Sequence, residues 1–256
     1  MNQRTQFDAA VAIPMSSDVA QQQRLVTPTQ FPKGDGSLNS PTVRICVCTS
    51  YPADREPRGP RHAATFAGLG NTHVTFLDAA PQDYECQEVQ CLERSNIEWH
   101  SLQFPTRESN FARWAGNKAF RATARTIFRT LGRIDNAAIN PNLGSLERQI
   151  ADARPDIIMA HNIDTLWPAF RVAQRAGAKL IFDSMEFHSD MGDGQDGVTM
   201  HMIEAIERRC LPQCRLVTSS GPRVSDALQE AYGIAQPLAL YNTPVIENDL
   251  TADKVD

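Results

Sequence analysis

Residues 155–188 read PDIIMAHNIDTLWPAFRVAQRAGAKLIFDSMEFHS, and this stretch decides the fold of the chain. Two short apolar runs, 157–160 and 179–182, flank a segment with helical periodicity that ends at Gly177. This pattern predicts a strand–helix–strand unit, in which the two strands are parallel neighbours in one sheet.

Polar side chains follow each apolar run. His161, Asn162 and Asp164 follow the first run, and Asp183 and Glu186 follow the second. Ligands of parallel sheets sit beyond the carboxyl ends of the strands. The sequence therefore predicts a binding site where these two polar clusters lie side by side.

The rest of the chain continues the alternation of strands and helices. We expect strands at 43–49, 73–78, 96–100, 215–218 and 237–241, and helices at 61–69, 111–134, 142–153, 198–210 and 222–232. This order is typical of an α/β fold with a doubly wound, Rossmann-like parallel sheet. We assign this domain to residues 42–246, after a disordered arm (1–41) rich in Gln, Ser, Thr, Pro and Gly and before a short tail (247–256).

Composition and charge narrow the class of protein. The apolar fraction of 41% and the charged fraction of 21% are ordinary for a soluble protein. A net charge of -5 gives no reason to expect a nucleic-acid partner. No apolar run is long enough to cross a bilayer, and no apolar core follows a basic N-terminus. We therefore expect a cytoplasmic protein.

The spacing of the six cysteines does not match a common zinc site. They stand at positions 46, 48, 86, 91, 210 and 214, and no histidine is suitably placed beside them. Buried free thiols are favoured over metal ligands, and we expect no metal.

Residues 111–134 predict a basic amphipathic helix. Apolar residues recur at helical spacing, beside a stripe formed by Arg121, Arg125, Arg129 and Arg133. Two interpretations stay open. The apolar stripe packs on the sheet with the arginines in solvent, or the arginines rest on anionic lipid headgroups while Trp114 dips into the membrane interface.

Taken in order, these motifs resemble the N-terminal, acceptor-side domain of family 4 glycosyltransferases, which have the GT-B fold. The resemblance rests on the loop 50–58 followed by Arg61, on HNIDTL (161–166), DSME (183–186) and TSS (218–220), and on NTP (242–244), and it covers roughly residues 43–244. Asn162 and Met185 differ from the aspartate and histidine that are common at these positions.

The resemblance implies transfer of a sugar from a nucleotide sugar to a hydroxyl acceptor, in polysaccharide or glycolipid synthesis. The acceptor is in some members lipid-linked, and no cofactor is implied beyond the nucleotide-sugar donor. Family members carry a second Rossmann-like domain that binds the donor, so we expect a separate C-terminal half and little transfer by this chain alone. A non-catalytic binding or scaffold module derived from such a half is the alternative. A dehydrogenase is disfavoured because no G-x-G-x-x-G follows the first strand.

The candidate catalytic residues are His161, Asp183 and Glu186. By resemblance His161 lies near the transferred sugar; its alternative role is to tie down the neighbouring loop. Asp183 and Glu186 bind acceptor hydroxyls or orient a base, and the alternative for Glu186 is a structural hydrogen bond.

The remaining candidates are residues that bind the donor or the acceptor. Arg58 and Arg61 lie at the start of the first helix, where backbone amides and guanidinium groups attract phosphate. Asp164 either caps the following helix or contacts ligand. The resemblance adds Asn162 and Ser219 to this set.

Overall fold

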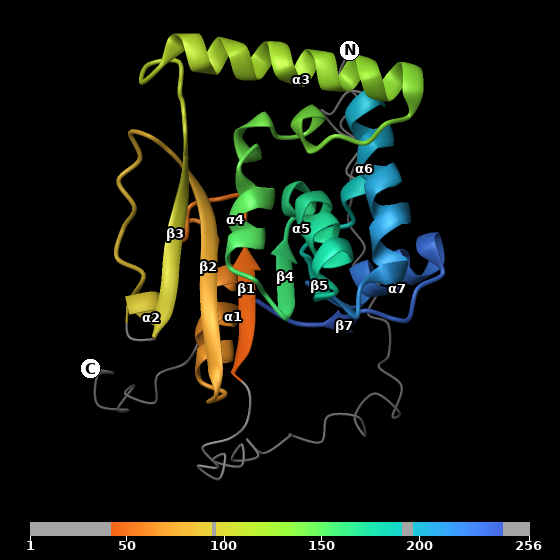
Figure 1. Ribbon diagram of the computed structural model, residues 1–256. Helices are drawn as coiled ribbons and strands as arrows, with labels where there is room; N and C mark the ends of the chain where they lie inside the picture. Colours follow the sequence, from red (N-terminus) through yellow and green to blue (C-terminus); the bar gives the residue numbers. More distant parts are fainter. Residues whose placement is uncertain (1–41, 94–95, 191–196, 243–256) are drawn as a thin grey trace, which may run out of the picture. The chain divides into compact units, whose positions relative to one another are not determined.

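A seven-stranded parallel sheet forms the centre of the domain (Figure 1). The computed structural model describes residues 42–93, 96–190 and 197–242, and the expected arm (1–41) and tail (247–256) lie outside them. The strand order is β3-β2-β1-β4-β5-β6-β7. The strands are β1 (Val43–Cys48), β2 (Thr72–Pro81), β3 (Ile97–Phe104), β4 (Ile157–His161), β5 (Lys179–Ser184), β6 (Leu216–Ser219) and β7 (Leu238–Ala239).

The helices lie between the strands as the alternation predicts. They are α1 (Arg58–Ala67), α2 (Gln90–Glu93), α3 (Phe111–Leu131), α4 (Leu146–Asp152), α5 (Ile163–Ala176), α6 (Gly197–Cys210) and α7 (Pro222–Tyr232). The expected helix at 142–153 is split into a 3-10 turn, η2 (Pro141–Leu143), and α4. The Rossmann-like α/β fold class is confirmed.

The strand–helix–strand unit of residues 155–188 forms as expected. β4 and β5 are parallel neighbours, and His161 stands directly opposite Asp183 in the register. α5 ends at Gly177, whose φ of 69° is the left-handed conformation that glycine adopts without strain. The two polar clusters are therefore adjacent at the carboxyl edge of the sheet.

Two apolar layers cover the two faces of the sheet. Ile158, Ala160 and Phe182 belong to the larger layer, together with residues of α4, α5 and α6. Met159 belongs to the smaller layer, together with Ala63 of α1. Figure 1 shows α1 behind the sheet and α4, α5 and α6 in front of it. Because side chains alternate along a strand, His161 and Asp183 point toward the α1 face.

Gly59 allows α1 to approach the sheet closely. A Cβ atom at this position would lie 3.2 Å from Cε2 of Phe76, on β2. Gly59 therefore serves the packing of α1 on the sheet, and this packing brings the polar side chains of α1 to the ends of β4 and β5.

The cysteines are free thiols, as expected. Cys46, Cys48 and Cys210 are buried, and burial raises the pKa of the Cys48 thiol to about 12. The expectation of burial is wrong for Cys86, which is exposed. The buried thiols act as small apolar side chains in the core.

α3 packs through only part of its apolar stripe, because Ala124 belongs to the larger apolar layer and Phe128 packs against that layer. Ala124 is its buried residue, whereas Phe120 and Leu131 are 52% and 76% exposed. Arg121 Nε donates to the Ala138 carbonyl at 3.2 Å, and Arg125 Nη2 donates to Thr199 Oγ1 at 3.0 Å. These bonds fix α3 to η1 (Asn136–Ala138) and α6. Within the described residues, no helix is both long enough and apolar enough to cross a membrane.

Candidate functional site

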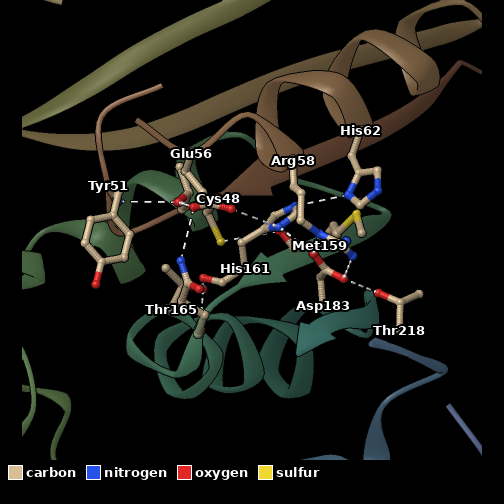
Figure 2. A network of polar contacts seen from close by, with 12 residues as sticks. Cys48, Tyr51, Glu56, Arg58, His62, Met159, His161, Thr165, Asp183 and Thr218 are labelled. Atoms are coloured by element: carbon tan, nitrogen blue, oxygen red, sulfur yellow. Dashed lines mark hydrogen bonds and ion pairs between the residues drawn. The ribbon is translucent and has the colours of Figure 1, made fainter. Parts of the chain in front are cut away.

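Asp183 is the centre of a buried polar network at the carboxyl edge of the sheet (Figure 2). Arg58 of α1 contacts both carboxylate oxygens, through Nε at 2.8 Å and Nη2 at 2.6 Å. Thr218 of β6 donates to Asp183 Oδ1 at 2.5 Å. Burial opposes ionisation, but the hydrogen bonds from His161 and Arg58 outweigh it and hold the pKa of Asp183 well below its ordinary value. Asp183 is therefore a fixed buried anion.

His161 connects Asp183 to a second imidazole. Its Nδ1 lies 3.0 Å from Asp183 Oδ2 and 3.5 Å from Glu56 Oε1. Its Nε2 lies 3.4 Å from Nδ1 of His62, and the two rings stack with centroids 5.1 Å apart. The His161 side chain is fully buried, whereas His62 is partly exposed. His62 thus lies between His161 and solvent.

Glu56, in the loop before α1, is a second buried carboxylate in the network. Its Oε2 accepts hydrogen bonds from the Thr49 hydroxyl and from Asn162 Nδ2, the latter at 3.1 Å. Burial raises the pKa of Glu56, although His161 and the Thr49 bond oppose this shift. Two carboxylates therefore flank the same nitrogen of His161.

The backbone is strained next to His161. Asn162 has φ 67° and ψ 154°, a region that residues other than glycine rarely adopt. Its side-chain amide is held by Glu56, and Thr165 Oγ1 donates to the His161 carbonyl at 2.6 Å. Strain of this kind persists only where surrounding contacts enforce it, and it concentrates at functional sites.

The structure does not favour the expected phosphate role of Arg58. Its guanidinium is buried, and besides Asp183 it donates through Nη1 to the Leu240 carbonyl at 2.8 Å. A phosphate would have to displace these partners. Arg61 is partly exposed and donates to Asn242 Oδ1 at 3.0 Å, so its phosphate role stays a prediction.

The remaining expected residues lie around the network rather than inside it. Glu186 is exposed, and the second carboxylate beside His161 is that of Glu56. The expected cap role of Asp164 is wrong, because Asn162 occupies the N-cap and Asp164 accepts from Asn140 Nδ2 at 2.9 Å. Ser219 is buried, with its hydroxyl donating to the Gly221 carbonyl.

Glu56, His62 and Thr218 are not among the site residues expected from the sequence. For Glu56 and His62, their spacing from Arg58 could have indicated a role. Glu56 precedes Arg58 by two residues, and His62 follows Arg58 by four, so that Arg58 and His62 share one face of a helix starting near residue 58.

The donor atoms of His62, His161 and Asp183 lie within 4.8 Å of one another, a spacing that could hold a metal ion. However, the positive guanidinium of Arg58 contacts both oxygens of Asp183. A cation would meet this charge and compete for the same oxygens. We therefore assign no metal to this cluster.

The burial of His188, shortly after β5, should make the stability of the fold sensitive to acid. His188 is 8% exposed, and burial lowers its pKa to about 4. The unfolded chain takes up a proton near pH 6.5, which the folded chain does not, so stability falls as pH drops from 6.5 to 4. At pH 5 this loss from His188 amounts to about 2 kcal/mol.

Replacing His188 by phenylalanine removes this contribution. We expect urea unfolding at pH 7.5 and pH 5 to show a smaller drop in stability for His188→Phe than for the wild type. An identical drop in both proteins would show that His188 does not cause the acid sensitivity.

A parallel Rossmann-like sheet with buried polar groups at its carboxyl edge places the candidate site where open α/β folds bind their ligands. The family model "Glycosyl transferase 4-like domain" matches residues 67–241. The chain belongs to this family of glycosyltransferase domains.

Solved structures with a similar fold match most of this chain. HepE of Anabaena, in complex with UDP, shares 12% identity at a TM-score of 0.42, over 79% of this chain and 44% of that one. The lipopolysaccharide outer core galactosyltransferase WaaB shares 13% identity at a TM-score of 0.43, over 80% of this chain and 47% of that one. The chain thus spans less than half the length of either protein. No curated protein matches the sequence.

Proposed function

We propose that this domain is the acceptor-side half of a glycosyltransferase that moves a sugar from a nucleotide-sugar donor to a hydroxyl acceptor in polysaccharide or glycolipid synthesis. Membership of the glycosyl transferase 4-like family supports the reaction class. The single observation that carries the site is the buried chain from Asp183 through His161 to the partly exposed His62. It provides a rigid set of imidazole nitrogens at the sheet edge where parallel sheets bind ligands.

The proposed roles follow from the contacts of each residue. Asp183 fixes the orientation of His161, and Arg58 and Thr218 hold Asp183 in place. Arg61, Asp164 and the exposed Glu186 are proposed contacts for the acceptor or the donor around this centre, with Asn162 and Ser219 shaping the strand ends. A second half supplies the donor-binding surface, and the nucleotide sugar is a substrate that needs no further cofactor.

A transfer assay tests this proposal. The chain is combined with a donor-binding half and incubated with UDP- and GDP-sugars and a panel of glycolipid and oligosaccharide acceptors, and products are detected by mass spectrometry. We expect a mass increase of one sugar for at least one donor. Binding of acceptor without transfer from any donor would instead support the binding-module alternative.

We also propose that the protein acts at the surface of an anionic membrane, in the cytoplasm. Phe111, Phe120 and Leu131 of α3 are 60%, 52% and 76% exposed. Lys118, Arg129 and Arg133 on and beside the same helix are also exposed. Basic groups next to exposed apolar side chains are what peripheral membrane helices use. Arg121 and Arg125 contribute less, because protein oxygens already accept from them.

Removing two exposed arginines should weaken binding to anionic vesicles. Each basic residue near such a surface contributes about 1 kcal/mol, so Arg129→Gln/Arg133→Gln should lower the partition coefficient about 30-fold. Cosedimentation with phosphatidylserine-containing vesicles measures it, and Arg223→Gln on exposed α7 is the matched control. Equal binding of all three proteins would contradict a lipid-facing α3.

A further inference from the structure

We propose that the groove between α3 and the start of α6 binds a phosphate group of a ligand. Four cations on one side of α3 line this groove: Lys118, Arg121, Arg125 and Arg129. None of the residues in the network around Asp183 lines it. The inference therefore goes beyond the proposed sugar transfer and does not depend on it.

The groove is long enough for a ligand with more than one phosphate group. Its main part has a volume of about 600 Å³ and reaches Val198, the second residue of α6. A second part, of about 560 Å³, shares Arg129 and Val198 with the first and continues to His201. Lys118 and Arg129 are eleven positions apart in sequence, which is about 16 Å along an α-helix. Figure 1 shows α3 lying across the end of α6 that forms this wall.

Protein contacts hold two of the arginines in place at the groove. Arg121 Nε donates to the Ala138 carbonyl at 3.2 Å, and Arg125 Nη2 donates to Thr199 Oγ1 at 3.0 Å. A guanidinium group has five N–H donors in a planar fork, which matches two oxygens of one phosphate. Because these side chains are already oriented, they lose little further freedom when they bind a ligand.

The groove has an excess of positive charge. Among the residues that the structure describes, no carboxylate lines it, and no acidic group pairs with the exposed Lys118 or Arg129. The ammonium group of Lys118 lies over the ring of Trp114, 5.6 Å from the ring centroid. Cations three and four positions apart on a helix repel one another. The first turn of α6 contains no acidic residue and adds a partial positive charge. An anion in the groove would relieve this repulsion.

Phosphate fits this set of cations better than a carboxylate does. A carboxylate has two oxygens and one negative charge, whereas a phosphate monoester has three terminal oxygens and up to two negative charges, so that it can contact several cations at once. The phosphate can belong to the headgroup of a lipid or to a soluble compound. Both sources present the same chemistry to the groove.

Calorimetric titration of the chain with inorganic pyrophosphate tests the groove. A charge-assisted hydrogen bond contributes about tenfold to affinity, so Lys118→Gln/Arg129→Gln should weaken binding about 100-fold. Both side chains are exposed, so we expect the variant to stay folded. The matched control is Arg113→Gln/Arg133→Gln, which removes the same charge from exposed positions near the two ends of α3, outside the groove. It should bind pyrophosphate like the wild type.

Vesicles distinguish the two sources of the phosphate. Each protein is cosedimented with phosphatidylcholine vesicles that contain phosphatidic acid, with and without pyrophosphate as a competitor. A lipid headgroup as the source predicts that Lys118→Gln/Arg129→Gln binds these vesicles less well than the control variant and that pyrophosphate displaces the wild type. A soluble source predicts that the two variants bind the vesicles alike although they differ in binding pyrophosphate. Either result supports a phosphate site in the groove.

Two results would overturn the proposal. One is a wild-type chain that binds no pyrophosphate. The other is equal affinity of the two double variants for pyrophosphate, because the groove would then contribute no more than the overall charge of α3. If circular dichroism shows that Lys118→Gln/Arg129→Gln is unfolded, Lys118→Gln alone decides, with an expected loss of about tenfold. None of these measurements involves sugar transfer, so a failure of the groove and a failure of the proposed function are detected separately.

Discussion

Replacing Asp183 by asparagine is expected to lower the free energy of unfolding by about 3–5 kcal/mol, the range for breaking a buried ion pair on one side. Asp183 is fully buried, its carboxylate accepts from Arg58 and Thr218, and Nδ1 of His161 lies 3.0 Å from its Oδ2. The variant keeps the size of the side chain but leaves the Arg58 guanidinium without its counter-charge. Urea unfolding at pH 7.5, followed by circular dichroism, measures the change.

Two further variants control this measurement. Thr218→Val removes one hydrogen bond to the same carboxylate and should cost only about 0.5–1.5 kcal/mol. The double variant Arg58→Met/Asp183→Leu replaces both charges by apolar groups and should recover much of the loss, because no unpaired charge remains. A loss below about 1 kcal/mol for Asp183→Asn would contradict the role of this ion pair in holding α1 on the sheet.

Replacing His161 by phenylalanine is expected to reduce the rate of sugar transfer about 10²- to 10⁴-fold, the usual contribution of a positioned proton-transfer group. Phenylalanine fills the same buried space and still stacks on His62, but it has no ring nitrogen to contact His62 or Asp183. The rate is measured on the assembled enzyme at saturating donor and acceptor.

The control for this variant is His73→Phe. His73 is a half-exposed histidine on β2, paired with Glu98 rather than with the buried network. We expect its rate to match the wild type. A His161→Phe enzyme that unfolds like the wild type and transfers sugar equally fast would show that His161 only ties down the β4–α5 junction.

The strands and the helix at the centre of the fold were predictable because several features of the local sequence mark them. The apolar runs at 157–160 and 179–182 have the length of buried strands, and Gly177 marks the end of the helix between them. The parallel register then places His161 opposite Asp183. This part of the site follows from the topology of the sheet.

The other half of the site depends on contacts that are distant in sequence. Glu56 and His62 reach His161 because α1 packs closely over β2, where Gly59 leaves room for Phe76. No periodicity in the loop 50–57 specifies this approach. The orientation of α3 could also not be predicted from the sequence, since an amphipathic pattern does not determine which surface its apolar stripe faces.

The proposed sugar transfer is tested most directly by its stoichiometry, measured with the wild-type chain combined with a donor-binding half. Nucleoside diphosphate release and glycosylated acceptor are quantified in the same reaction. We expect one molecule of product for each molecule of nucleoside diphosphate, with both rates falling together in His161→Phe. Unchanged release of nucleoside diphosphate in His161→Phe, or no glycosylated product from the wild type with any donor, would contradict it.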